Sequence, residues 1–178
     1  MKVIKTEIPD VLILEPKVFG DSRGYFFESF SQREFDKEVA KIEFVQHNES
    51  CSSKGVVRGM HFQKPPFSQA KLVRCVKGKV RDVALDIRKD SPTYGKYIEV
   101  ILSAENHRQL FIPKGFAHGF EVLSDQAVFL YLCDEYYHPE AEGGINAFDP
   151  DLGINWSVAE NEATVSDKDR TLPLLKEI

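Results

Sequence analysis

Short runs rich in Val, Ile, Phe and Tyr, separated by turn residues, are the feature of this sequence that most restricts its fold. Such runs occur at residues 97–102, 108–112, 119–123 and 127–133. Turn-forming residues interrupt them, for example the Pro-Lys-Gly segment at 113–115. This spacing is typical of antiparallel all-β proteins, and it predicts a closed barrel or a jelly roll.

The clearest pair of runs lies at residues 72–76 and 79–87. Both runs alternate between polar and apolar residues, as strands with one buried face do. Gly78 lies between them and can adopt the positive φ that a tight turn requires. We therefore expect these two runs to form a β-hairpin.

Helical patterns are scarce. The segment Ser-Gln-Arg-Glu at 31–34 resembles a capping box, and Phe35, Val39 and Ile42 recur at helical intervals. They predict one short helix near residues 31–41, and we expect a second helical turn near the C-terminus. Because the chain has no internal repeat and no Gly/Ser-rich linker, residues 1–178 are expected to form a single domain.

Composition excludes several classes of protein. A formal net charge of -5 argues against a protein that coats nucleic acid. No stretch approaches the ~20 apolar residues of a membrane span, and the apolar run at 11–14 is too short for a signal peptide, so we expect a cytoplasmic protein without membrane contact. Cys51, Cys75 and Cys133 form no C-x-x-C pair, so neither a disulfide framework nor a thiolate zinc site is expected.

Residues 113–118, Pro-Lys-Gly-Phe-Ala-His, have the form P-x-G-x-x-H. This resembles the second motif of the cupin superfamily and implies an all-β, cupin-type double-stranded β-helix or jelly-roll barrel with one or two short helices. In metal-binding cupins this His joins a His-x-His pair and a carboxylate, because the ion needs several converging ligands. The earlier segment 58–63 offers one His, His61, so we expect no catalytic metal.

Seven motifs occur in a characteristic order. They are Asp-Ser-Arg-Gly-Tyr-Phe-Phe-Glu at 21–28, Phe-Val-Gln-His-Asn at 44–48, Arg-Gly-Met-His-Phe-Gln at 58–63, Lys-Leu-Val-Arg at 71–74, Phe-Leu-Tyr at 129–131, Tyr-Tyr at 136–137 and Ser-Asp-Lys-Asp at 166–169. In order and approximate spacing they resemble the dTDP-4-dehydrorhamnose 3,5-epimerase family over essentially the whole chain.

The resemblance implies a cofactor-free isomerase. Its reaction would convert dTDP-4-dehydro-6-deoxy-D-glucose to dTDP-4-dehydro-L-rhamnose, in dTDP-L-rhamnose biosynthesis. Protons would be removed and returned at carbons 3 and 5, which lie beside a ketone. The chain has no G-x-G-x-x-G segment, P-loop or nucleophile elbow, so neither nicotinamide nor ATP is implied.

The resemblance also implies catalytic roles. His61 would be the base, Asp169 would orient its ring, and Tyr131 would be the acid on the opposite face of the sugar. Lys71 would stabilise charge on the ketone oxygen as the enolate forms. Separately, Asp82 falls among alternating apolar residues and is expected to point inward, where it could help to fix His61.

The diphosphate of such a substrate needs guanidinium partners, which Arg23 and Arg58 match by position. Tyr137 would stack against the thymine. The remaining residues that the resemblance assigns to the ligand are Glu28, Gln46, Asn48, His118, Glu142 and Lys168. The family is typically a homodimer with exchanged N-terminal strands, which would let Arg23 and Glu28 act across the interface. His47, His107 and His138 match no motif role.

Other functions remain open from the motifs. A relative that epimerises one carbon of another dTDP-deoxysugar would use the same His61, Tyr131 and Asp169. A metal-dependent cupin enzyme would need a bound ion, and a non-catalytic cupin that binds sugar nucleotides would have no need of a base, an acid and an orienting carboxylate together.

Overall fold

Thirteen short strands dominate the structure, which is a computed structural model describing residues 1–178. The strands are β1 (Lys2–Lys5), β2 (Leu12–Glu15), β3 (Phe19–Asp21), β4 (Gly24–Phe26), β5 (Gln46–Ser53), β6 (Val57–Gln63), β7 (Lys71–Lys77), β8 (Lys79–Asp86), β9 (Tyr97–Ser103), β10 (Gln109–Ile112), β11 (Phe116–Val122), β12 (Gln126–Cys133) and β13 (Glu142–Gly144). The helical elements are α1 (Gln32–Glu38), η1 (Pro139–Ala141), α2 (Asp167–Arg170) and η2 (Leu175–Glu177).

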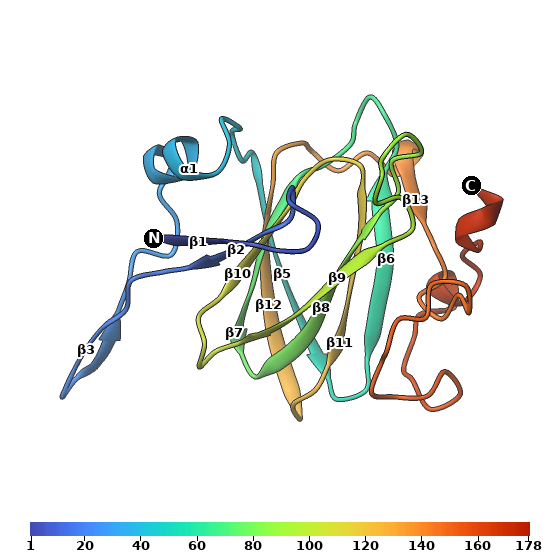
Figure 1. The fold of residues 1–178 in the computed structure, drawn as a ribbon. Coiled ribbons are helices and arrows are strands. Elements are labelled where there is room, and N and C mark those ends of the chain that lie inside the picture. Colours follow the sequence, from blue (N-terminus) through green and yellow to red (C-terminus); the bar gives the residue numbers. More distant parts are fainter.

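Two antiparallel sheets face each other across the interior (Figure 1). The six-stranded sheet has the order β1-β2-β10-β7-β12-β5, and the five-stranded sheet has the order β13-β6-β11-β8-β9. Buried apolar residues of both sheets meet between them, among them Leu110 and Phe129 from the first and Val100 and Phe120 from the second. The predicted all-β, cupin-type jelly roll is confirmed.

The predicted hairpin at Gly78 is wrong. β7 pairs with β10 and β12, whereas β8 pairs with β9 and β11, so the chain crosses from one sheet to the other at this glycine. Alternation in each run reflects one face buried in the common core, and it does not require the two runs to pair. Gly78 does adopt a positive φ of 76°, as expected.

α1 confirms the helix predicted near residues 31–41, and it ends earlier, at Glu38. The Ser31 hydroxyl accepts a hydrogen bond from the Glu34 N–H at 3.5 Å and so caps the helix. Phe35 is buried against Leu14 and Leu72 on the outer face of the six-stranded sheet. The expected C-terminal helical turn is present as α2.

A two-stranded arm, β3–β4, projects away from the barrel (Figure 1). Three of its aromatic side chains are exposed: Phe19, Tyr25 and Phe26, with Phe26 at 71%. Exposed aromatic side chains gathered on one element mark a surface suited to protein contact.

The segment after β13 covers the outer face of the five-stranded sheet. Ile145, Leu152 and Trp156 pack there against Met60 and Leu85. This second core positions α2 beside β6. No helix in the structure has the length and apolar character needed to cross a membrane.

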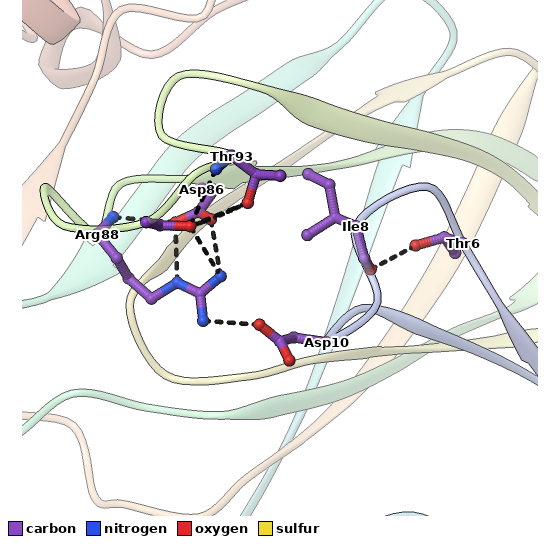
Figure 2. A network of polar contacts seen from close by, with 7 residues as sticks. Thr6, Ile8, Asp10, Asp86, Arg88 and Thr93 are labelled. Atoms are coloured by element: carbon purple, nitrogen blue, oxygen red, sulfur yellow. Dashed lines mark hydrogen bonds and ion pairs between the residues drawn. The ribbon is translucent and has the colours of Figure 1, made fainter.

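A polar network fastens the β1–β2 loop to the β8–β9 loop (Figure 2). The Arg88 guanidinium donates to Asp86 Oδ2 at 2.7 Å and to Asp10 Oδ2 at 2.8 Å. The fully buried Asp86 carboxylate also accepts from the Ser91 and Thr93 hydroxyls, each at 2.6 Å. These contacts fix two loops that lie far apart in the sequence.

Candidate active site

A cavity of about 260 Å³ opens between the two sheets. The six-stranded sheet lines it with Gln46, Asn48, Lys71 and Tyr131. From the five-stranded sheet come His61, Phe62, Gln63 and Glu142, and two loop residues, Gln69 and Tyr137, complete the lining. A ligand in the cavity would therefore meet different side chains on its two sides.

His61 lies on β6, and its partner is Asp169 on α2. The His61 Nε2 atom lies 2.8 Å from Asp169 Oδ1, and the second carboxylate oxygen accepts from the Gly59 N–H at 3.2 Å. The His61 side chain is 35% exposed to the cavity, whereas that of Asp169 is 6% exposed. The buried carboxylate thus fixes the ring while leaving its other nitrogen free to face a ligand.

Asp169 remains ionised although it is buried. Burial by itself raises the pKa of its carboxyl group, but hydrogen bonds from His61, the Gly59 N–H and Ser166 outweigh that effect and hold the pKa below its usual value. A carboxylate in this state can stabilise the imidazolium that forms when the ring accepts a proton. The pair is suited to take up a proton from a carbon acid.

Two glycines, Gly59 on β6 and Gly119 on β11, approach each other closely beside Asp169. β6 and β11 pair with a register shift between His118 and Phe120. A Cβ atom at Gly119 would lie 2.6 Å from Met60 Sδ and 2.7 Å from the Arg58 carbonyl oxygen, so only glycine fits without movement. At this contact, the Gly59 N–H donates to the Asp169 carboxylate.

Tyr131 lies on β12 and lines the cavity from the opposite sheet. Burial raises the pKa of its phenol, the nearby Cys133 adds to that effect, and the positive charge of Arg58 partly offsets it. The phenol is therefore protonated at neutral pH. It can donate a proton to a carbanion on the face opposite His61.

Lys71 lies on β7 beside Cys133 in the sheet register and lines the same cavity. Burial lowers the pKa of its ammonium group, and the nearby Cys133, Asp82 and Glu142 oppose that effect. When it carries its proton, the half-buried Lys71 side chain can stabilise negative charge on a ligand oxygen.

The expectation that Asp82 fixes His61 is wrong. Asp82 Oδ1 lies 2.7 Å from His118 Nε2, because β8 pairs with β11 and the register brings Asp82 beside Phe120. Asp82 does point inward, as expected, and it is fully buried. His118, assigned to the ligand by resemblance, is itself buried and lies opposite His61 in the β6–β11 register.

Other residues predicted to bind the ligand cluster at the cavity mouth. Gln46 Nε2 donates to Asn48 Oδ1 at 3.1 Å. The Tyr137 hydroxyl donates to Glu142 Oε2 at 2.9 Å, and Lys168 forms an ion pair with the same carboxylate. Hydrogen bonding to Lys168 lowers the pKa of Glu142, and the bond to Glu142 raises the pKa of Tyr137.

Six predicted residues lie outside the lining of this cavity. Asp169 and Lys168 contact the lining residues His61 and Glu142, and His118 lies opposite His61 in the strand register. The other three are Arg58, Arg23 and Glu28. Arg58 is close enough for its charge to act on Tyr131, and its Nε donates to the Ser52 hydroxyl at 2.9 Å. Arg23 lies in the turn of the β3–β4 arm with its side chain 87% exposed, and it pairs with Asp21. Glu28 lies beyond the arm and lines a separate cavity beside α1.

Two glutamines that the motifs left unassigned, Gln63 and Gln69, also line the cavity. Gln63 belongs to the motif that contains His61. Its residue type does not indicate a role in the site, because glutamine is equally common on any polar surface. The structure has no cluster of three or more His, Cys, Asp or Glu side chains placed to hold a metal ion.

A family model described as dTDP-4-dehydrorhamnose 3,5-epimerase matches residues 5–177. The chain belongs to this family. The dTDP-4-dehydrorhamnose 3,5-epimerase of Shigella flexneri is 59% identical over 170 residues, which are 95% of this chain and 93% of the relative. The resemblance inferred from the motifs is confirmed.

Solved structures of dTDP-sugar epimerases share the fold. The dTDP-6-deoxy-D-glucose-3,5-epimerase of Legionella pneumophila Philadelphia 1, in complex with dTDP-4-keto-L-rhamnose, has a TM-score of 0.95 and 49% identity, with 99% of this chain and 94% of that chain covered. A 3'-monoepimerase from Streptomyces bikiniensis, in complex with dTDP-quinovose, has a TM-score of 0.90 and 34% identity. The match covers 97% of this chain and 87% of that chain.

Proposed function

We propose that the chain is a cofactor-independent dTDP-4-dehydrorhamnose 3,5-epimerase that converts dTDP-4-dehydro-6-deoxy-D-glucose to dTDP-4-dehydro-L-rhamnose. One observation carries the proposal: His61, which is paired with Asp169, and Tyr131 line one cavity from opposed sheets. Inversion of a carbon needs a proton acceptor on one face and a proton donor on the other. Membership of the family supplies the substrate class.

In the proposed mechanism, His61 removes the proton from a carbon beside the substrate ketone. Asp169 stabilises the imidazolium that results, and Lys71 stabilises the negative charge that develops on the ketone oxygen. Tyr131 then gives a proton to the opposite face of the same carbon. Exchange with solvent removes the proton from His61 and returns one to Tyr131. Because the ketone acidifies both neighbouring carbons, the same residues can then act at carbon 3 and at carbon 5 in turn.

In this proposal, residues at the cavity mouth bind the nucleotide. Tyr137 stacks on the thymine, and Arg58 binds the diphosphate. His118, which is buried opposite His61 in the β6–β11 register, is a further ligand-binding residue in this proposal. Gln46, Asn48, Glu142 and Lys168 supply the remaining polar contacts. The support is that Gln46, Asn48, Tyr137 and Glu142 surround the same cavity as His61.

The proposal includes a homodimer in which the β3–β4 arm enters the partner's site. Because β1 and β2 pair within the chain's own sheet, the proposal assigns the exchange to the β3–β4 arm. Its exposed Phe19 and Phe26 supply apolar contact area. Arg23 is carried outward by the arm, and together with Glu28 it would bind ligand in the partner's cavity.

Subunit mixing tests this arrangement. Arg23→Ala and His61→Ala chains are each expected to have low activity, but a mixed dimer would contain one site with both residues intact. Random mixing of equal amounts should restore about a quarter of the wild-type rate, because half of the dimers are mixed and each has one intact site. A monomer by light scattering, or no restoration, would contradict exchange.

Proton NMR in deuterium oxide tests the reaction. Wild-type protein should introduce deuterium at carbons 3 and 5 of dTDP-4-dehydro-6-deoxy-D-glucose and invert both, and the His61→Ala variant should do neither. Deuterium at one carbon alone would favour the second candidate, a single-carbon epimerase. That candidate is supported by the 34% identity to the Streptomyces bikiniensis 3'-monoepimerase.

A further inference from the structure

Gln63, a buried residue of β6, binds the segment that carries Tyr137. Gln63 Nε2 donates to the Tyr136 carbonyl at 3.0 Å and to the Phe67 carbonyl at 2.7 Å. Gln63 Oε1 accepts from the His138 N–H at 2.6 Å. One amide thus binds the backbone on both sides of Tyr137 and joins that segment to the loop before β7.

Only an amide can make these contacts. The group offers two N–H donors and one carbonyl acceptor, and all of these are used by partners of the matching kind. Gln63 is 6% exposed, so an unmade bond would leave a buried polar group without a partner. It lies two residues after His61 on β6 and therefore moves with the catalytic strand.

Two further glutamines bind the same segment. Gln69 Nε2 donates to the Glu135 carbonyl at 2.8 Å, and Gln46 Oε1 accepts from the Tyr137 N–H at 3.0 Å. The rings of Phe67 and His138 stack with centroids 3.8 Å apart. Gln63 differs from the other two glutamines because it alone binds residues on both sides of Tyr137.

Tyr137 itself has little else to hold it. Tyr137 is 52% exposed. Its side chain makes one polar contact, the hydrogen bond from its hydroxyl to Glu142. The direction of the ring therefore depends on the backbone of residues 135–138. A ring held in place before binding loses less entropy when a flat ligand stacks on it.

We propose that Gln63 is a positioning residue for nucleotide binding, acting through Tyr137: its amide holds residues 136–138 so that the Tyr137 ring is preorganised beside the cavity. The inference rests on the proposed function, because it takes the base of a thymidine nucleotide as the ligand of Tyr137. Gln63 touches neither the reacting carbons nor the base in this proposal.

A double-mutant cycle on dTDP binding, measured by calorimetry, tests the inference. Gln63→Leu should weaken dTDP binding about ten-fold, because two hydrogen bonds to the segment and one to the loop before β7 are lost. In a Tyr137→Ala background the same change should weaken binding by less than about two-fold, since the ring is already absent. Inorganic pyrophosphate, which lacks a base, should bind wild type and Gln63→Leu equally.

Gln63→Glu provides a second variant should the leucine variant fail to fold. It keeps the side-chain volume and the acceptor for His138, but it replaces both donors with an oxygen, and it should also weaken dTDP binding. The matched control is Gln32→Leu on α1, whose amide donates to Asp36 Oδ1 and the Ile42 carbonyl, each at 2.6 Å, away from the cavity. Its dTDP affinity should equal that of wild type.

The outcomes separate this inference from the proposed function. Equal weakening with and without the Tyr137 ring, equal weakening of pyrophosphate, or unchanged dTDP affinity would overturn the role of Gln63 while leaving the epimerase in place. A wild-type protein that bound no dTDP would overturn both. Weakening that requires the Tyr137 ring and spares pyrophosphate would establish the role.

Discussion

His61 and Tyr131 lie on strands of different sheets, β6 and β12, and both line one cavity. The two sheets are joined by side-chain packing across the barrel and not by backbone hydrogen bonds between β6 and β12. The spacing between the proton acceptor and the proton donor is therefore set by the core, and it is fixed before a ligand enters.

The His61–Asp169 pair predicts a large loss of turnover when its carboxylate is neutralised. Asp169→Asn removes the charge that stabilises the imidazolium, so turnover should fall by about 100-fold or more while dTDP binding persists. Coupled assays and calorimetry would measure the two effects. Asp167→Asn, an exposed neighbour on α2, is the matched control and should leave turnover unchanged.

Tyr131→Phe should separate proton removal from inversion. The variant keeps His61 and Asp169, so deuterium should still enter the substrate with retained configuration, whereas inverted product should form at least ~100-fold more slowly. Proton NMR in deuterium oxide distinguishes the two products. Inversion at the wild-type rate would show that a group other than Tyr131 supplies the second proton.

The close approach of β6 and β11 predicts that Gly119→Ala affects both the fold and the site. The added methyl group would overlap Met60 Sδ and the Arg58 carbonyl oxygen, and we expect a loss of about 1–3 kcal/mol in the free energy of unfolding. Because Gly59 donates to Asp169, turnover should fall more than dTDP affinity. Unchanged stability would indicate that the strands can separate freely.

The network around Asp86 predicts a stability that depends on pH (Figure 2). Burial raises the pKa of this carboxyl group, but hydrogen bonds from Arg88, Ser91 and Thr93 outweigh burial and hold the pKa far below its usual value. The ionised group therefore stabilises the fold above the unfolded-state pKa of about 3.9, and this contribution is lost as the pH falls towards the folded-state pKa.

Asp86→Asn should accordingly lower the free energy of unfolding by about 2 kcal/mol at pH 7, as charged hydrogen bonds are lost. Denaturant titration should show this difference shrinking below about pH 4, where the carboxyl group begins to protonate in the unfolded chain while it stays ionised in the folded protein. Asp10→Asn is the control, because Asp10 pairs with the same Arg88 from an exposed position. This substitution should lower the free energy of unfolding by less than about 1 kcal/mol.

Strand positions were predictable from the sequence because a half-buried strand imposes alternation on its residues. The run at 97–102 is β9, and that at 127–133 is β12, each within one residue. Pairing was not predictable: Gly78 joins strands of different sheets, and no local pattern distinguishes that crossing from a hairpin. For the same reason Asp82 was predicted to contact His61, whereas it contacts His118. Its partner depends on which strand lies beside β8.

The site shows a similar division. His61 and Asp169 are 108 positions apart, so their contact follows from the packing of the C-terminal segment and was accessible only through the family resemblance. No sequence pattern predicts the contact between Asp82 and His118 or the hydrogen bonds of Gln63. Both depend on backbone groups and strands that are brought together by the fold.

The strand order also determines how the chain must reach this structure. In the six-stranded sheet only β1 and β2 are consecutive in sequence, and β12 inserts between β7 and β5. Such non-local pairing makes refolding slow, on the scale of milliseconds to seconds. Until residues 126–133 are in place, β5 and β7 present open edges to other chains, so the period of greatest exposure to aggregation during synthesis lies before β12 emerges.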